Sequence, residues 1–536
     1  MIKFYEEKPM KKFYEEKPMN KFHKMFCLLL LSVLVFTACT PAQPAVPTEV
    51  AAEAAPVATS VPAATDAPAA VPTDEPPAAP VTVTYTYPNT VFKDVGLVED
   101  ALNELLVPAS NTILKLNPID WGAFDEKMKL GFAAGEECDI VFTAPWINNY
   151  LINIANGNLL PLDDLLLEHA PGLWASMPET TWDAARVDGK IYGVINQQIF
   201  VKPFGLYVRR DLADKYGLDV YALKSYDELE PFMKTILKEE PGVLPLGGAG
   251  TWTDEGVGFD PIVGQGVPVV IRFDDKDMTV VNAAASPEFL TSIERARRWF
   301  LAGYTPKESV AGDDAENAWK AGKFAIGGLA GVVKPGGEIE NEQRSGQPVY
   351  AQSIGPVFLT TAGTTATTNA ICSSSKNPEA AMKVLEQLNT NVEIYNILSK
   401  GIQGKHWEWA DEANKVIKPG PNNDDYKPNT DWEFGNQFLA YYIDAKQAAM
   451  KAWEATYKLN TESPPSVAMG FNFNAEPVKT ELANLSAVSG ELLPPLASGL
   501  VDPATALPAY LERLEQAGLQ TVIDEAQRQL NEWAGN

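Results

Sequence analysis

Tryptophans flanked by amides and carboxylates are the side chains of this sequence best suited to hold a ligand. Sugars present C–H faces that stack on aromatic rings, and hydroxyls that need paired hydrogen-bond donors and acceptors. Trp146, with Asn148 and Asn149 after it, comes just past the end of a predicted strand. Open α/β sheets bind ligands at the carboxyl ends of their strands. We therefore expect these residues to contact a saccharide; the alternative is a tryptophan that only anchors its loop.

Further candidates share this polar and aromatic character. Trp252 and Trp432 are flanked by polar groups instead of lying in an apolar stripe, and Asp254 follows the first of them. The amides at 196–198 follow a predicted strand, with an ordinary polar loop as the alternative, and Thr367 precedes another strand. The complete predicted ligand-binding set is Trp146, Asn148, Asn149, Asn196, Gln197, Gln198, Trp252, Asp254, Thr367 and Trp432.

The composition excludes several classes of partner. The 536 residues carry 43 Lys and Arg against 70 Asp and Glu, a formal net charge of -27. Nucleic acids need a basic stripe, which this acidic chain lacks, and an anionic membrane surface is equally disfavoured. Three His and four Cys are too few for a zinc framework or a disulfide scaffold, so we expect no metal and no cofactor.

Catalytic motifs are absent from the sequence. There is no Gly-x-Ser-x-Gly elbow and no His-Glu-x-x-His, and only His169 and His406 lie beyond the predicted signal peptide. Gly322-Lys323 lacks the earlier glycine that a phosphate-binding loop requires. Carboxylates are abundant, so an anchored glycoside hydrolase is the main enzymatic alternative. We expect a protein that is not an enzyme.

The first 38 residues read as a leader and a secretory signal. The apolar run from Met25 to Phe36 is too short for a permanent membrane helix. It is followed by Thr-Ala-Cys, which resembles the lipobox of bacterial lipoproteins and predicts lipidation of Cys39, with a plain signal peptide as the alternative. The segment KFYEEKPM occurs twice, at 3–10 and at 12–19, and we interpret Met19 as the true start.

Residues 39–81 read as a tether that joins the lipidated cysteine to the folded body. From Thr40 to Pro80 the chain is dominated by Ala and Pro and contains no aromatic residue, Lys or Arg. Such a segment buries too little apolar surface to offset its ordering entropy, so we expect a disordered chain with polyproline character.

The elements that must position the candidate residues begin after the tether. Alternating strands at 82–87, 113–116 and 139–142 are separated by helical patterns around 98–106 and at 123–134, which predicts an α/β lobe with a mainly parallel sheet. Near the end, Asp502-Pro503 marks the start of one helix. A final helix spaces its apolar residues, up to Trp533, for burial in the core.

Four stretches resemble family 1 extracellular solute-binding proteins. They are 139–172, beginning DIVFTAPWINNY; 189–212, with GKIYGV and GLYVRRDL; 371–381, reading ICSSSKNPEAA; and 469–533. The last of them is similar to the C-terminal domain of the lipoprotein subgroup known as LipO- or LplA-like. Together these stretches extend over nearly all of residues 82–536.

The resemblance implies a two-lobed periplasmic-binding fold of type II, like maltose-binding protein, with a helical C-terminal extension. It places 82–200 and about 335–395 in lobe 1, 201–334 and about 396–470 in lobe 2, and 471–536 in the C-terminal domain. It implies a monomer, anchored outside the cell, that closes around a solute and delivers it to the permease of an ABC importer. An oligosaccharide is the expected solute, with a peptide as the alternative, and a sensory binding protein is the alternative function.

The same fold brings Cys138 and Cys372 onto neighbouring strands, so a disulfide between them is one expectation. Two buried free thiols are the preferred one, because strand-to-strand geometry often misses the narrow disulfide window.

Overall fold

The structure is a computed structural model, and it describes residues 79–248, 250–264, 266–307 and 312–535. The predicted leader, signal peptide, Cys39 and nearly all of the tether lie outside the described residues. Within these described ranges, no helix combines the length and the apolar character that a bilayer crossing demands.

A five-stranded sheet forms the centre of the first lobe, in the order β2-β1-β3-β14-β6. Its strands are β1 (Val81–Pro88), β2 (Thr112–Ile119), β3 (Ile140–Thr143), β6 (Gly193–Ile195) and β14 (Thr368–Ile371). β1 pairs in parallel with β2 and β3, whereas β14 pairs antiparallel with β3 and β6. The strand-helix alternation predicted from the sequence is confirmed, and the sheet becomes mixed only where β14 and β6 join it.

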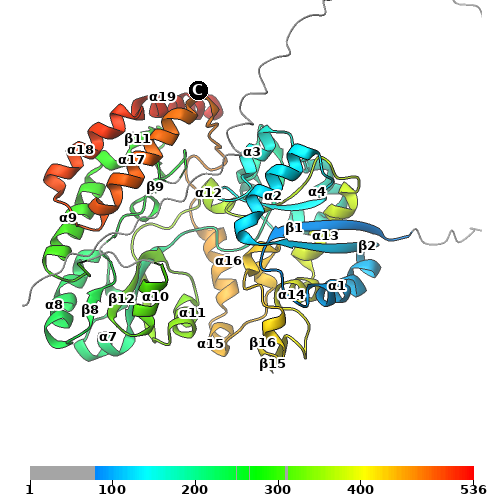
Figure 1. Ribbon diagram of the computed structural model, residues 1–536, viewed down its shortest axis with the longest axis horizontal. Coiled ribbons are helices and arrows are strands. Elements are labelled where there is room, and N and C mark those ends of the chain that lie inside the picture. Colours follow the sequence, from blue (N-terminus) through cyan, green and yellow to red (C-terminus); the bar gives the residue numbers. More distant parts are fainter. Residues whose placement is uncertain (1–78, 249, 265, 308–311, 536) are drawn as a thin grey trace, which may run out of the picture. The chain divides into compact units, whose positions relative to one another are not determined.

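Helices and two short hairpins surround this sheet, and β1 and β2 lie side by side within it (Figure 1). The helices are α1 (Val95–Ser110), α2 (Trp121–Ala134), α3 (Tyr150–Ala155), α4 (Asp163–His169), α5 (Pro171–Ala175), α6 (Glu179–Ala184), α12 (Thr361–Thr364), α13 (Pro378–Thr390), α14 (Val392–Lys400), α15 (Ala445–Ala449) and α16 (Ala452–Glu462). The hairpins are β4 (Arg186–Val187) with β5 (Lys190–Ile191), and β15 (Trp407–Asp411) with β16 (Val416–Pro419).

Cys138 and Cys372 form a disulfide, so the preferred expectation of two free thiols is wrong. β3 and β14 pair antiparallel up to Ile140 opposite Ile371, which brings the residues just beyond those strand ends together. Their Cα atoms lie 5.8 Å apart, inside the disulfide range of about 4.4–6.8 Å. The bond ties the edge of β3 to a strand that follows it by more than two hundred residues.

A second sheet has four strands in the order β13-β7-β12-β8. They are β7 (Phe204–Arg209), β8 (Leu244–Leu246), β12 (Phe324–Val332) and β13 (Val349–Ser353). The helices of this lobe are α7 (Arg210–Tyr216), α8 (Glu230–Glu239), α9 (Pro287–Leu301), α10 (Gly312–Lys320) and α11 (Gly337–Ser345).

The C-terminal segment forms three helices beside a small third sheet. The helices are α17 (Lys479–Ala497), α18 (Pro503–Gln516) and α19 (Leu519–Ala534), and the strands are β9 (Phe259–Asp260), β10 (Val269–Arg272) and β11 (Val281–Asn282). Figure 1 shows the helices in orange and red next to β9 and β11. Their buried leucines share one core with β10 and α9, so this extension is continuous with the second lobe.

The sequence predicted the start of α18 correctly, but it did not predict the exposure of Trp533 in α19. The Asp502 side chain caps α18 by accepting a hydrogen bond from the Ala504 N–H, as the sequence indicates. Trp533, however, is 44% exposed and meets the Phe471 ring edge-on at 5.9 Å. It lies in the last turn of α19, beyond the point where the helix packs on its neighbours.

The sheets divide the chain at different places from the predicted lobe boundaries. β13 pairs with β7 over five residues, so 349–353 lies in the second sheet although the sequence grouped 335–395 with lobe 1. Tyr426 and Phe434 pack in the core around β1, although 396–470 was grouped with lobe 2. Two segments that connect the sheets run together where Leu359 pairs with Pro465.

Candidate ligand-binding site

Three tryptophans lie together at one edge of the first sheet, and we call Trp121, Trp146 and Trp432 the tryptophan platform. Trp121 begins α2 directly after β2, Trp146 follows β3, and Trp432 lies in a short 3-10 helix, Asp431–Glu433. β2 and β3 run parallel to β1, so their carboxyl ends reach the same edge. The ring centroids of each pair are 6.1 Å apart, and the rings of Trp121 and Trp146 are stacked within 19°.

The platform offers an accessible aromatic surface. Trp146 is 54% exposed, whereas Trp121 and Trp432 are half-buried. The Trp146 indole N–H donates to the Ala366 carbonyl at 2.9 Å, which fixes the ring while leaving much of it open to solvent. Such a surface can cover the C–H face of a pyranose. Trp121 was missed from the sequence, although its position directly after a strand is the same signal that pointed to Trp146.

The amides at 148 and 149 shape the turn that presents Trp146 and are not free for a ligand. Asn148 is 6% exposed, has a left-handed backbone (φ 45°), and donates to the Phe142 carbonyl at 2.8 Å. Asn149 caps α3 by accepting from the Ile152 N–H, and its side chain donates to the Pro145 carbonyl. Both side chains therefore hold the loop.

Asn196 and Gln197 are likewise used inside the protein. Asn196 is fully buried, accepts from the Asn369 side chain at 2.7 Å and donates to the Glu433 carbonyl at 2.9 Å. Gln197 donates to the Ser176 hydroxyl at 2.7 Å. Of these contacts, the bond from Asn196 to the Glu433 carbonyl holds the segment that carries Trp432.

Gln198 and Thr367 form a second support for that segment. The Gln198 amide donates to the Thr367 hydroxyl at 2.7 Å, and this hydroxyl donates to the Trp432 carbonyl at 3.3 Å. Gln198 is half-buried while Thr367 is only 3% exposed. Of the polar residues predicted around the platform, only Asn149 and Gln198 are not buried.

A buried carboxyl group follows Trp432 directly. Glu433 is 0% exposed, one carboxyl oxygen accepts from the Asn89 amide at 3.1 Å, and the other has no hydrogen-bond partner among the described residues. Burial raises the pKa of Glu433 to about 8, although hydrogen bonds from Thr430 and Asn89 act in the opposite direction. The group is therefore mostly protonated at neutral pH and adds no full charge beneath the platform.

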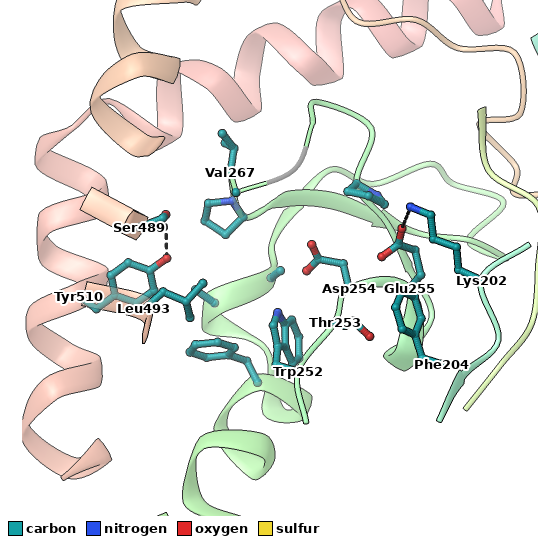
Figure 2. Close-up of a pocket in the computed structure, with 16 residues that line it drawn as sticks. Lys202, Phe204, Trp252, Thr253, Asp254, Glu255, Val267, Ser489, Leu493 and Tyr510 are labelled. Carbon is teal, nitrogen blue, oxygen red and sulfur yellow. Dashed lines mark hydrogen bonds and ion pairs between the residues drawn. The ribbon is translucent and has the colours of Figure 1, made fainter. Parts of the chain in front are cut away.

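The other two predicted residues, Trp252 and Asp254, lie in a separate pocket of about 320 Å³ that we call the Trp252 pocket. Figure 2 shows both side chains among those that surround it. The Trp252 ring meets the edge of Phe289 at 90°, with centroids 5.0 Å apart. No ring contact among the described residues links Trp252 to the platform. The predicted single set therefore divides into two groups, one on each lobe.

Charges in the Trp252 pocket are largely compensated. Lys202 and Glu255 form an ion pair at 3.0 Å. Burial, together with the neighbouring Glu255 carboxylate, raises the pKa of Asp254 to about 7. The pocket thus combines aromatic surface, hydroxyls and a carboxyl group that is about half ionised at neutral pH. In the part of the chain that the structure describes, no three His, Cys, Asp or Glu side chains gather as a set of metal ligands.

Comparisons with known proteins place this architecture. A crystal structure of the N-glycan transport solute-binding protein NgtS from Streptococcus pneumoniae superposes with a TM-score of 0.75 at 24% identity, covering 85% of this chain and 99% of that one. An extracellular solute-binding protein from Bifidobacterium longum subsp. infantis gives a TM-score of 0.62 at 15% identity, covering 86% and 99%. These two-domain proteins confirm the type II periplasmic-binding fold.

Sequence comparisons identify the family. The chain is 28% identical over 458 residues to a carbohydrate ABC transporter substrate-binding protein of Streptococcus pneumoniae serotype 4, covering 82% of this chain and 90% of that protein. A domain of unknown function (DUF3502) matches residues 467–535. The family described as bacterial extracellular solute-binding protein matches residues 98–393, more than half of the chain. The chain belongs to this family of bacterial extracellular solute-binding proteins.

Proposed function

We propose that this protein captures an oligosaccharide outside the cytoplasm and delivers it to the permease subunits of an ABC importer. The observation that carries the proposal is the tryptophan platform, an exposed aromatic surface at the sheet edge where α/β folds bind ligands. Aromatic rings that are half open to solvent and fixed by a hydrogen bond suit the C–H face of a sugar better than an ion or a nucleotide.

The relatives support the same class of solute. One of them is a carbohydrate transporter component. NgtS has been crystallised with Man1GlcNAc, and that complex superposes on this chain with a TM-score of 0.66 at 25% identity, covering 85% and 100%. In our proposal the platform takes one part of the saccharide and the Trp252 pocket another, and closure of the two lobes is favoured because only the closed state contacts both.

Thermal-shift screening tests the proposed solute class. Purified protein is mixed with neutral oligosaccharides, including Man1GlcNAc, and with peptides of similar length. A ligand at about 100 times its dissociation constant adds roughly 2.7 kcal/mol of stability, which is readily measured. A shift with peptides and none with saccharides would refute the saccharide assignment.

The proposed anchoring rests on the sequence. Thr-Ala-Cys at 37–39 after an apolar run supports cleavage before Cys39 and lipidation of its thiol. Mass spectrometry of the membrane fraction tests this: the N-terminal peptide should begin at Cys39 and carry a diacylglycerol group, and an unmodified peptide would contradict the anchor. A lipid on Cys39 would keep the binding protein close to the permease.

A further inference from the structure

One wall of the Trp252 pocket comes from the C-terminal helices. Ser489 and Leu493 on α17 and Tyr510 on α18 face Trp252 and Asp254, which belong to the second lobe (Figure 2). The region that contributes this wall is the domain of unknown function at 467–535. Without these helices the pocket would be open on that side.

The C-terminal wall is held firmly against the second lobe. The ring centroids of Tyr510 and Phe289 are 6.4 Å apart, and the Phe289 ring also meets the Trp252 ring. Leu485 and Leu514, on α17 and α18, are fully buried in the core that also contains Phe289. This shared packing fixes the position of Tyr510 relative to Trp252, as a binding site requires.

Two hydroxyl groups of this wall border the pocket, and both residues are buried: Tyr510 is 1% and Ser489 is 4% exposed. The Tyr510 and Ser489 hydroxyls are 2.9 Å apart, and either can be the donor. This pair joins α17 to α18 and so holds the wall in place.

The Asp254 carboxyl borders the pocket, where the Trp252 side chain hydrogen-bonds to it. Asp254 stands at the N-cap of the 3-10 helix Glu255–Val257, and its side chain makes no capping bond. Lys202, the only cation among the described residues that line the pocket, is already paired with Glu255. A carboxylated or sulfated ligand would therefore find no unpaired positive charge here and would meet the Asp254 carboxyl.

The size of the pocket suits one sugar unit. Its volume of about 320 Å³ lies near the lower end of ligand pockets, roughly 300–1,000 Å³. This corresponds to about ten water molecules at ~30 Å³ each, enough for a single pyranose but not for a chain of them. Trp252 and Leu493 supply apolar surface, and Asp254 supplies a partner for a sugar hydroxyl.

We propose that the C-terminal domain is a ligand-binding module that, with the Trp252 loop, encloses one uncharged monosaccharide unit at the end of the captured oligosaccharide. The inference rests on the proposed function, and it assigns the selection of neutral over acidic saccharides to the pocket that this domain closes. Leu493 is the residue of the domain that borders the space of the sugar ring, and the Tyr510–Ser489 pair holds the wall behind it.

The test compares saccharide affinity in three variants by titration calorimetry. Tyr510→Phe removes only the hydroxyl and should weaken binding about 5- to 10-fold. Leu493→Trp fills the pocket and should weaken binding at least about tenfold. Leu500→Trp is the matched control, since Leu500 is 40% exposed on the same domain outside the pocket lining, and it should bind as the wild type does. The probes are Man1GlcNAc, neutral oligosaccharides from the screen, and uronic-acid oligosaccharides of equal length.

Each outcome separates this inference from the proposed function. Wild-type affinity in both Tyr510→Phe and Leu493→Trp, with binding still sensitive to Trp146→Ala, would overturn the role of the C-terminal domain and leave oligosaccharide capture standing. Uronic-acid oligosaccharides that bind as tightly as neutral ones would also overturn it. Absence of any saccharide binding by the wild type would overturn both. Circular dichroism and a melting curve without ligand show whether each variant folds, and Tyr510→Phe, which keeps the ring, serves if Leu493→Trp does not.

Discussion

Replacement of Trp146 by alanine should weaken saccharide binding strongly while hardly changing the fold. An indole side chain exposes on the order of 200 Å² when free, so 54% exposure leaves roughly 110 Å². A pyranose that covers half of this area and buries as much of its own C–H surface removes about 110 Å² from water. At ~25 cal/mol per Å² this is about 2.8 kcal/mol, or roughly 100-fold in the dissociation constant.

Titration calorimetry with the saccharide found by screening measures this loss, and Trp533→Ala provides the control. Trp533 is 44% exposed, meets the ring of Phe471 edge-on and lies near Gly470, so its removal also deletes an open indole but leaves the platform intact. Its affinity should equal that of the wild type. If Trp146→Ala binds within about twofold of the wild type, the platform is not a ligand surface and the reasoning fails.

Three further variants examine the scaffold around the site. Replacement of both Cys138 and Cys372 by serine should lower the free energy of unfolding by about 3 kcal/mol, because the disulfide closes a loop with a sequence separation of 234. Urea denaturation measures this loss, and an unchanged midpoint would contradict it. Burial raises the pKa of Asp260 from 3.8 to about 7. Between these two values the folded protein holds a proton that the unfolded chain releases. The contribution of Asp260 to stability therefore falls as pH rises from about 4 to 7. Calorimetry should show Asp260→Asn more stable than the wild type at pH 8.5 and equal to it at pH 4; equal stability at both values would refute the shift. Asn196→Ala should cost roughly 2 kcal/mol of stability, since it removes one buried acceptor of the Asn369 amide and one donor to the Glu433 carbonyl, yet it should weaken saccharide binding far less than Trp146→Ala.

The sequence predicts the strand ends well because their signal is local. Alternating residues from 82 to 87 and the apolar run at 140–142 locate two strands, and two of the three tryptophans chosen beside polar groups, Trp146 and Trp432, belong to the platform. Trp121 was overlooked because it also reads as the first residue of a helix, which Asp120 caps. A helix start and a ligand surface coincide there, and only the positions of the other two rings show it.

Polar residues at 148, 196 and 197 illustrate what local pattern cannot show. Their types suit a ligand, but in the fold they are satisfied by internal partners. Asn196, for example, bonds to groups 173 and 237 positions away in the chain. No periodicity reports such long-range pairing. The same holds for the wall of the Trp252 pocket, which reads in the sequence as an ordinary amphipathic helix until Tyr510 is brought opposite Asp254.

The two groups of site residues differ in a way that divides affinity from selectivity. The platform is open and fixed in advance by Ala366 and the network beneath Trp432, so little ordering is needed when a sugar stacks on it. Stacking, however, distinguishes poorly between sugars that share a flat C–H face. Discrimination is strongest where buried polar groups lose their partners with the wrong ligand. The enclosed pocket between Trp252 and Tyr510 has that character, so changes there should alter which saccharide is bound, whereas changes in the platform should weaken all of them alike.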